Sequence, residues 1–438
     1  MLTLTPRTKL YSIEEVREHN KETDAWVVID GNVLDVTSWI PKHPGGSHLI
    51  AAFAGNDCSG EFAAFHFPQT YSFLKTYQVG ELKGGGSGPQ EEREFHKLRR
   101  KFWEQGLFDI EPWYFVACIL RVLAFALPAF LLISRGGNIS LKLVGGVCLG
   151  FFEQQSLLMA HDFLHRAVFK KRNASFWGGW FTGSVCGGVG AAWWRRDHFV
   201  HHALTNVLDV DPSAGADPFV FIDSKQFLHK KRGAFDYFTL RAQPWLYFPI
   251  CLFFARFNLH FISILASPGK LIDAIGVSLF FVWKYLLLSQ LSNVREMVVV
   301  WSVAHLVCSV LHLQLNVAHF PTYMWNKEHV HDRGFLYHQI ITTMNITCSR
   351  FEHWFHGGLE YQIEHHMFPL LPRNQLGNVA PEVKKLLKET GLPYRTESFF
   401  QANVTCWKMI KNVTEECLQR RKQTPAGEPT IGFAMKEI

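Results

Sequence analysis

Five long apolar runs constrain the fold of this chain more than any other feature of its sequence. Residues 113–134 and 141–160 are each long enough, at about 1.5 Å per helical residue, to cross a hydrocarbon core of about 30 Å. Three further apolar runs follow at about residues 245–265, 271–291 and 296–318. Runs of this length are typical of transmembrane helices, so we expect a polytopic membrane protein.

The placement of charge predicts which side of the membrane each segment faces. Basic residues concentrate in cytosolic loops, and here they cluster before the first apolar run, after the second run and along the C-terminal tail. The N-terminus has no continuous apolar stretch of the kind that a signal peptide contains. We therefore expect both termini to be cytosolic. The net charge of +6 suits an anionic leaflet, and no basic stripe interleaved with aromatic residues indicates nucleic acid.

Three short histidine-rich boxes carry the strongest chemical signal. Their residues stand at helical spacings of i, i+3 and i+4, which bring side chains onto one face of a helix. The first box is HDFLH, the second is HFVHH and the third lies in YQIEHHMFP, and together they contain His161, His165, His198, His201, His202, Gln362, His365 and His366. Imidazoles that converge in this way are typical of a metal site.

The spacing of the boxes along the chain limits the number of membrane crossings. The first box begins where the second apolar run ends, and the second box follows in the adjoining cytosolic segment. If the third box shares the same centre, an even number of crossings separates it from the second box. Three apolar runs lie between them, so one run is expected to be interfacial or re-entrant. The prediction is an all-α membrane domain with about four transmembrane helices and a cytosolic histidine-rich cap.

The N-terminal region has the pattern of a small α+β domain that binds haem. The segment WVVIDGNVLDV predicts a β-hairpin around Asp30 and Gly31. The motif HPGG begins at His43, and its glycines let the backbone pass close to a flat ligand. A second histidine, His66, follows later. Two imidazoles fill both axial positions of a haem iron and leave no open site, which is typical of an electron carrier.

A further histidine and the electron carrier define the metal chemistry. His319 stands at the cytosolic end of the last apolar run and is predicted to complete the set of ligands, whereas His312 is expected to be a packing residue. Nine donors exceed what one ion accepts, which predicts two metal ions. An attached one-electron carrier favours iron over zinc, because zinc has no redox chemistry. We also expect His353 and His356 to lie outside the site.

A Gly/Ser-rich stretch, GGGSGP, follows the N-terminal domain and predicts a flexible connection. The expected organisation is a haem domain over residues 1–83, a flexible linker over 84–95 and a membrane domain over 96–438. The alternative is an ordered segment packed on the membrane domain.

Over nearly its full length the chain resembles the membrane fatty acid desaturases, specifically the front-end desaturases with a fused N-terminal cytochrome b5 domain. The resemblance rests on HPGG, HDFLH, HFVHH and the phrase WFHGGLEYQIEHHMFP. It implies haem b and two non-haem irons as cofactors, and no catalytic side chain beyond the metal ligands. In this subgroup glutamine takes the place of the first histidine of the third box, which implies that Gln362 belongs to the metal site.

The resemblance also implies a reaction and its partners. A cis double bond is expected between an existing double bond and the carboxyl end of an acyl chain, with O2 as oxidant. Electrons are expected from NADH-cytochrome b5 reductase through the haem, at the endoplasmic reticulum membrane. The position attacked and the acyl carrier, whether CoA or a lipid, are not encoded by any motif.

Other readings remain open from the sequence alone. A sphingoid-base desaturase or a fatty acid hydroxylase with a fused cytochrome b5 domain would share most of these motifs. A non-enzymatic membrane haem carrier or metal transporter is the alternative of another class. Carboxylates beside the ligand histidines are expected to accept their second ring N–H; these are Asp162, Asp197 and Glu364.

Overall fold

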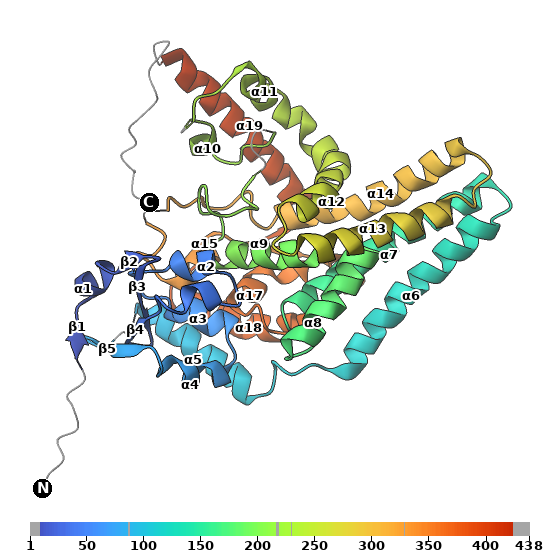
Figure 1. Ribbon diagram of the computed structural model, residues 1–438. Coiled ribbons are helices and arrows are strands. Elements are labelled where there is room, and N and C mark those ends of the chain that lie inside the picture. The colour runs from blue at the N-terminus through green and yellow to red at the C-terminus, as the bar shows by residue number, and fades with distance from the viewer. Residues whose placement is uncertain (1–8, 86–87, 216–218, 229, 328, 424–438) are drawn as a thin grey trace, which may run out of the picture.

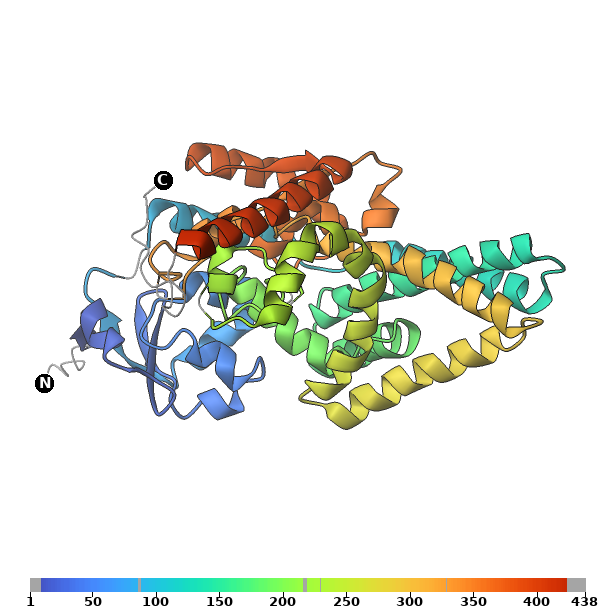
Figure 2. The same ribbon diagram turned by 90° about the horizontal axis from the view of Figure 1, so that it is seen from above.

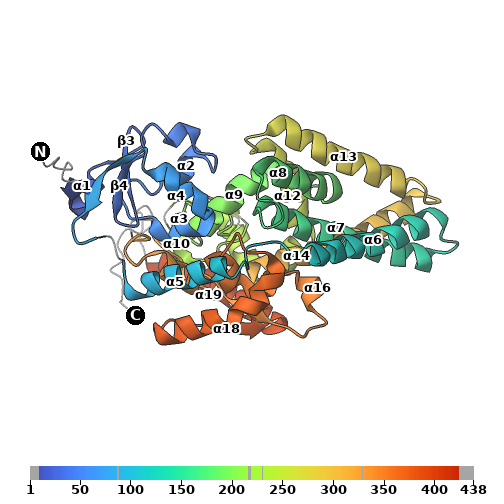
Figure 3. The ribbon, with the colours of Figure 1, turned by 90° about the horizontal axis from the view of Figure 1, so that it is seen from below.

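The computed structural model describes residues 9–85, 88–215, 219–228, 230–327 and 329–423. A small α+β domain at the N-terminus stands beside a larger helical part (Figure 1). Four helices of the helical part, α6, α7, α13 and α14, extend away from the N-terminal sheet, and Figures 2 and 3 show the same separation from two other sides. The predicted architecture of a haem-type domain followed by a mostly helical domain is confirmed.

The N-terminal domain is built on a five-stranded sheet with the strand order β1-β5-β4-β3-β2. Its strands are β1 (Leu10–Tyr11), β2 (Asn20–Lys21), β3 (Asp24–Ile29), β4 (Asn32–Asp35) and β5 (Gln78–Leu82). Its helices are α1 (Ile13–Arg17), the 3₁₀ turn η1 (Ile40–Lys42), α2 (Ser47–Ala51), α3 (Ser59–Phe65), the 3₁₀ turn η2 (Pro68–Thr70) and α4 (Tyr71–Leu74).

The predicted hairpin is present as β3 and β4, which pair in antiparallel register from Trp26 with Asp35 to Ile29 with Asn32. Asp30 and Gly31 form the turn with φ angles of 48° and 77°. Two successive positive φ angles define the turn type that matches the twist of a hairpin. The Asp-Gly signal therefore fixed both the place of the turn and its geometry.

The helical part contains the remaining elements. Its first half comprises α5 (Gln90–Glu104), α6 (Pro112–Arg135), α7 (Ile139–Leu164), α8 (Arg172–Gly179), the π-helical turn η3 (Trp180–Cys186), α9 (Ala191–Ala203) and α10 (Ser224–Leu228). It continues with α11 (Ala234–Pro249), the π-helical turn η4 (Ile250–Phe254), α12 (Ala255–Leu265), α13 (Lys270–Leu288), α14 (Val294–Asn316) and α15 (Phe335–Ile341). The last elements are β6 (Asn345–Thr347), α16 (His353–His356), the 3₁₀ turn η5 (Leu359–Tyr361), α17 (Gln362–Met367), α18 (Arg373–Glu389), β7 (Thr396–Ser398) and α19 (Phe399–Gln423).

All five predicted apolar runs are helical. Helix α6, helix α7, the continuous segment 234–265, helix α13 and helix α14 are each long and apolar enough to cross a membrane. Helix α6 exposes large apolar side chains, among them Leu120 at 60% and Leu127 at 61%. A row of exposed leucines on a long helix is favourable in lipid and unfavourable in water. The described residues thus contain five candidate membrane spans, whereas the spacing of the histidine boxes predicted about four transmembrane helices.

Small residues and a buried ion network hold the long helices together. A Cβ at Gly150 of α7 would lie 2.6 Å from the carbonyl oxygen of Ala304 in α14, so glycine permits this close approach. Glu153 of α7 accepts contacts of 2.7 Å from Arg256 of α12 and 2.6 Å from Lys284 of α13. These two basic residues interrupt the apolar runs in the sequence, and their pairing explains how they are accommodated among buried helices.

The predicted flexible linker is wrong at its C-terminal end. Helix α5 begins at Gln90, inside the predicted range 84–95, and residues 86–87 of that range lie outside the described residues. Phe95 is fully buried, and its ring centroid lies 5.4 Å from that of Phe335 and 5.5 Å from that of Phe368. The Glu92 carboxylate accepts a hydrogen bond of 3.0 Å from the backbone N–H of Leu336. These residues are helical because their apolar side chains are buried against the helical part.

The two parts of the chain share hydrophobic cores. Ala63 and Ala64 of α3 belong to the same buried cluster as Phe95, Phe335 and Phe368. A second cluster joins the interior of the N-terminal sheet to the segment after α9; its buried members include Val27, Leu34, Phe53, Ala203, Leu204, Val207 and Trp325. The N-terminal domain is therefore docked on the helical part through continuous apolar contacts.

Candidate functional site

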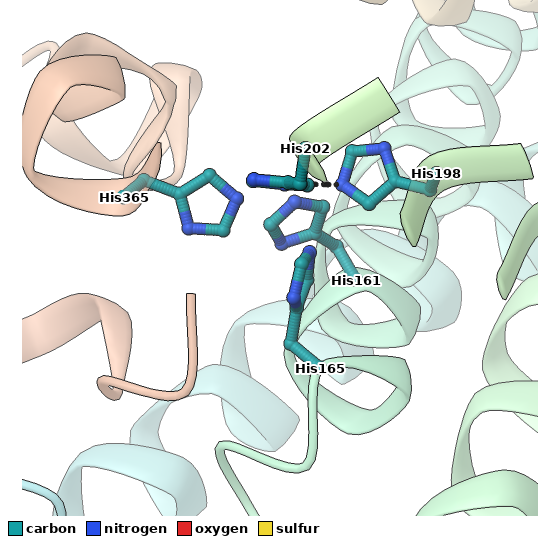
Figure 4. A group of neighbouring side chains, drawn as sticks. All are labelled: His161, His165, His198, His202 and His365. Atoms are coloured by element: carbon teal, nitrogen blue, oxygen red, sulfur yellow. Dashed lines mark hydrogen bonds between the residues drawn. The ribbon is translucent and has the colours of Figure 1, made fainter. Parts of the chain in front are cut away.

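Eight histidines from four separate segments meet in two adjacent groups. The first group brings together ring nitrogens that all lie within 4.8 Å of one another, and its members are His161, His165, His198, His202 and His365. The second group, at the same mutual separation, consists of His201, His319 and His366. Figure 4 shows the five rings of the first group turned toward a common centre. The structure therefore brings together all eight histidines that the sequence predicted as ligands.

Helix geometry divides the histidines between the two groups. Helix α9 places His198 and His202 in the first group and His201 in the second. Helix α17 likewise sends His365 to the first group and His366 to the second. The groups are close neighbours, because the ring centroids of His202 and His366 are 4.1 Å apart. Two short helical segments therefore set the separation of the two groups.

Each histidine of the second group has one ring nitrogen occupied by a protein acceptor. His201 Nδ1 lies 2.9 Å from Asp211 Oδ2, and His319 Nδ1 lies 3.1 Å from the carbonyl oxygen of Thr342. His366 Nδ1 lies 2.9 Å from Gln339 Oε1. An acceptor at Nδ1 holds the proton there and leaves the Nε2 lone pair for a metal ion. The donor set fits one cation.

The first group contains buried nitrogens that have no partner within the described part of the chain. There, neither nitrogen of His165 has a hydrogen-bond partner, and the same holds for Nδ1 of His202 and Nε2 of His365. The Nε2 atoms of His198 and His202 point at each other across 3.0 Å. A small cavity of about 10 Å³ is lined by His161, His165 and His365. Buried unpartnered nitrogens are rare in folded proteins, and a cation among them satisfies these lone pairs.

Burial keeps these imidazoles neutral. It is the largest cause that lowers the pKa of His165, His198 and His202 well below the usual value, and neighbouring histidines lower it further. Burial also lowers the pKa of His319 to about 3. A neutral imidazole has a lone pair to donate, whereas an imidazolium has none. The arrangement is therefore ready to bind metal at neutral pH.

The predicted carboxylate partners of the ligand histidines are wrong. Asp162 pairs with Arg373 at 2.8 Å, Asp197 pairs with Arg196 at 2.6 Å, and Glu364 accepts from Asn345 and Tyr394 at 2.8 Å and 2.7 Å. Sequence proximity misled because neighbours of a histidine on a helix point away from its face. The partners that sequence reasoning missed are Asp211, Gln339 and the carbonyl of Thr342.

Four further side chains were considered in the sequence as members of the metal site or as its neighbours: Gln362, His312, His353 and His356. Gln362 begins α17, and its buried side chain lies one turn before His365. His353 Nδ1 lies 2.7 Å from Glu360, and His356 Nδ1 lies 3.2 Å from Gln314. His312, His353 and His356 belong to neither histidine group. The role of Gln362 as a ligand stays a prediction.

The second site lies in the N-terminal domain between His43 and His66. Their ring centroids are 6.2 Å apart, a separation that accommodates two metal–nitrogen bonds of about 2.0–2.1 Å each. His43 Nδ1 lies 3.1 Å from the carbonyl of Gly46, and His66 Nδ1 lies 3.0 Å from that of Phe62. Both Nε2 atoms thus remain available. Burial lowers the pKa of His66 to about 4, which keeps its ring neutral.

A large apolar cavity surrounds these two histidines. Its volume is about 260 Å³, and Leu34, Phe53 and Phe62 are among the residues that line it. Glycines of the HPGG motif make room beside it, because a Cβ at Gly45 would lie 2.8 Å from the His43 ring. A mostly apolar cavity that is lined by two imidazoles at this separation fits a haem.

Comparisons with known proteins agree with both sites. The sequence profile of the family described as "Fatty acid desaturase" matches residues 138–398, and the one described as "Cytochrome b5-like Heme/Steroid binding domain" matches residues 12–83. The first profile implies a di-iron centre and the second implies haem, and the residues described above fit both groups.

Full-length relatives extend the similarity to the whole chain. A Delta(8)-fatty-acid desaturase of Helianthus annuus is 31% identical over 443 residues, covering 95% of this chain and 93% of that protein. An acyl-lipid (9-3)-desaturase of Borago officinalis is 29% identical over 434 residues, covering 95% and 96%. Fatty acid desaturase 3 of Homo sapiens is 30% identical over 443 residues, covering 91% and 92%. The chain is therefore a membrane-bound oxidoreductase of the fatty acid desaturase family, one with a cytochrome b5 domain at its N-terminus.

Proposed function

We propose that this protein is a front-end desaturase that inserts a cis double bond between an existing double bond and the carboxyl end of an acyl chain. The observation that carries the proposal is the meeting of eight histidines in two adjacent groups, beside helices that are apolar enough to lie in a membrane. The names of the relatives support a front-end reaction, since they include Delta(8)-fatty-acid desaturases and an acyl-lipid (9-3)-desaturase.

The chemistry requires an oxidant that a redox metal can supply. An unactivated methylene has no acidic proton and no leaving group, so acid–base side chains cannot remove its hydrogens. Two irons held by the two histidine groups, with Gln362 as a further ligand, supply the O2-dependent oxidising power that this step needs when they are bound. The protein's own part is to hold neutral imidazoles at fixed positions and to keep the site buried, which protects other C–H bonds from oxidation.

Electrons are proposed to arrive through the haem held by His43 and His66. Phe65 lies on the wall of the haem cavity, and its ring centroid is 6.4 Å from that of His202. Phe199 also lines this cavity, and its ring centroid is 5.8 Å from that of His165. One aromatic side chain thus separates the haem cavity from each of these two histidines. The short separation supports electron transfer within the docked protein, without a swinging tether.

The remaining partners follow from this route. We propose NADH-cytochrome b5 reductase as the electron donor and the endoplasmic reticulum as the membrane. The N-terminus, the histidine groups and the C-terminus are placed on its cytosolic side, where NADH is available. Basic clusters beside the first two spans support this orientation.

A product analysis tests the proposal. The full chain and His365→Ala are expressed in a host that lacks polyunsaturated lipids, and candidate fatty acids are supplied one at a time. The wild type is expected to form a new alkene, and His365→Ala is expected to form none while its reduced haem spectrum stays intact. The half-exposed His329, replaced by alanine, is the matched control and keeps activity. A hydroxylated product, or an alkene from His365→Ala, contradicts the proposal.

A further inference from the structure

The haem cavity is not enclosed by the N-terminal domain alone. Its wall includes Leu164 and Phe199 of the helical part, together with the side chains of Arg166, Arg172 and Arg195. The cavity therefore opens onto three guanidinium groups that belong to the desaturase part of the chain. A cytochrome b5 domain on its own contains none of these residues, because its profile ends at residue 83.

The three arginines have no carboxylate partner within the described ranges. Among the residues that the structure describes, none of Arg166, Arg172 and Arg195 forms an ion pair within 4.0 Å. Arg166 lies over the ring of Phe67 at 4.5 Å and donates hydrogen bonds to the carbonyl oxygen of Lys170, one of them 3.2 Å long from Nε. Arg195 lies over the ring of Phe176 at 5.1 Å. These neutral partners position Arg166 and Arg195 without supplying a negative charge.

Arg166, Arg172 and Arg195 line the same cavity as the two haem-binding histidines, His43 and His66. Among the described residues that line the cavity, the one carboxyl group belongs to Glu61, and burial, together with the charge of Glu92, raises its pKa well above the usual range. Glu61 therefore does little to balance the arginines. An anionic ligand at the rim of the cavity would balance the positive charge of the arginines.

We propose that Arg166, Arg172 and Arg195 bind the two propionate carboxylates of the haem, so that the desaturase part completes the haem site. Haem carries this pair of carboxylates on one edge, and guanidinium groups are the strongest carboxylate donors among side chains. The inference rests on haem binding by His43 and His66, as the proposed function does, but it does not depend on the acyl substrate or the product.

The position of the arginines gives this contact a structural role. Arg166 directly follows His165, and Arg195 precedes His198 by one turn of α9. The segments that carry the metal-binding histidines therefore also hold the edge of the haem. Haem binding and docking of the two domains are coupled, because a propionate bound at these residues spans both parts.

The test compares haem with haem dimethyl ester, which lacks the two negative charges. Full-length apoprotein in detergent is loaded with either compound, and release to excess apomyoglobin is followed by absorbance. In Arg172→Gln/Arg195→Gln, haem is expected to be released about tenfold faster, as for two weakened charge-assisted hydrogen bonds. The ester is expected to be released at the same rate from wild type and variant. Arg166 is left intact because it adjoins His165.

Matched controls separate charge from general damage. Arg395→Gln removes an exposed arginine that does not line the cavity and is expected to behave as wild type. Arg172→Lys/Arg195→Lys keeps the charge and is expected to restore most of the slow release. The glutamine variant should also shift the haem reduction equilibrium about threefold toward the ferric form, which corresponds to a midpoint about 28 mV lower at 59 mV per tenfold.

Two results overturn the inference. One is equal acceleration of haem and ester release by the glutamine substitutions, which indicates loss of packing rather than loss of a carboxylate contact. The other is no acceleration with either compound together with an unchanged midpoint potential. Neither readout uses desaturation. If the arginine inference fails, the product analysis still stands, and if no alkene is formed, the haem measurements still decide the inference.

Discussion

Replacing Asp211 by asparagine should weaken one metal site and leave the other intact. Asp211 is fully buried, and all of its neighbours are donors: His201 Nδ1 at 2.9 Å, the N–H of Asn206 at 2.7 Å and the N–H of Ser213 at 2.8 Å. Burial raises the pKa of Asp211, but the interaction with His201 and the hydrogen bonds from Asn206 and Ser213 outweigh it and lower the pKa below its ordinary value. The carboxylate is therefore ionised and accepts every contact that surrounds it.

The size of the loss in metal affinity follows from the amide group of asparagine, which cannot accept hydrogen bonds at both of its terminal atoms. Its amide nitrogen must face at least one of these donors, and a buried N–H without an acceptor costs about 1–3 kcal/mol. Loss of an acceptor behind a ligand histidine typically weakens metal binding about 10- to 100-fold, which corresponds to about 1.4–2.7 kcal/mol. Only the second group contains His201, so one of two irons should be affected.

The assay is the ratio of non-haem iron to haem after dialysis against increasing chelator. The ratio should fall from about two to about one in Asp211→Asn at chelator concentrations that leave the wild type unchanged. Asp209→Asn is the matched control: Asp209 is exposed, its φ of 59° suits asparagine, and it contacts Lys230 at 3.3 Å on the surface. An unchanged ratio in Asp211→Asn, or an equal loss in both variants, would refute the reasoning.

Two stability predictions concern the packing between parts of the chain. Burial raises the pKa of Glu92 from 4.5 to about 7, so the folded state keeps a proton that an unfolded chain releases. Thermal stability should therefore decrease as the pH rises from about 4.5 to about 7. The melting temperature should differ less between pH 5 and pH 8 in Glu92→Gln than in the wild type. An equal difference in both proteins contradicts the prediction. Gly150→Ala places a Cβ 2.6 Å from the carbonyl of Ala304 and should destabilise the protein by about 1–3 kcal/mol, as overpacking does. Gly137→Ala has open space and should melt like the wild type, and equal melting of both variants refutes the packing argument.

Local spacing was enough to predict that the histidines of the second box lie on one helix. The i, i+3 and i+4 pattern of HFVHH survives as helix α9, and the apolar runs survive as long helices. The division into groups of five and three was not accessible, because it depends on how α9 meets α17 and the segment after α14. The same holds for Asp211 and Gln339, which reach the histidines through tertiary contacts.

Composition misled where burial decides conformation. The Gly/Ser-rich stretch predicted flexibility through residue 95, yet Phe95 is buried and residues from Gln90 onward form α5. In the sequence, Arg256 and Lys284 are charged residues that interrupt apolar runs. Their partner Glu153 lies more than a hundred residues away from each of them. No local pattern shows such a pairing, since it exists only once three helices are packed.

The two metal groups consist of imidazoles, and among the described residues the carboxylate that is hydrogen-bonded to one of these imidazoles is Asp211, at His201. Neutral donors do little to offset the charge of a bound cation, and a redox metal in such surroundings favours its lower oxidation state. On the electron route proposed above, this donor set would favour the uptake of electrons by iron bound there. The choice of ligand would then affect the direction of electron flow as well as the site of the metal.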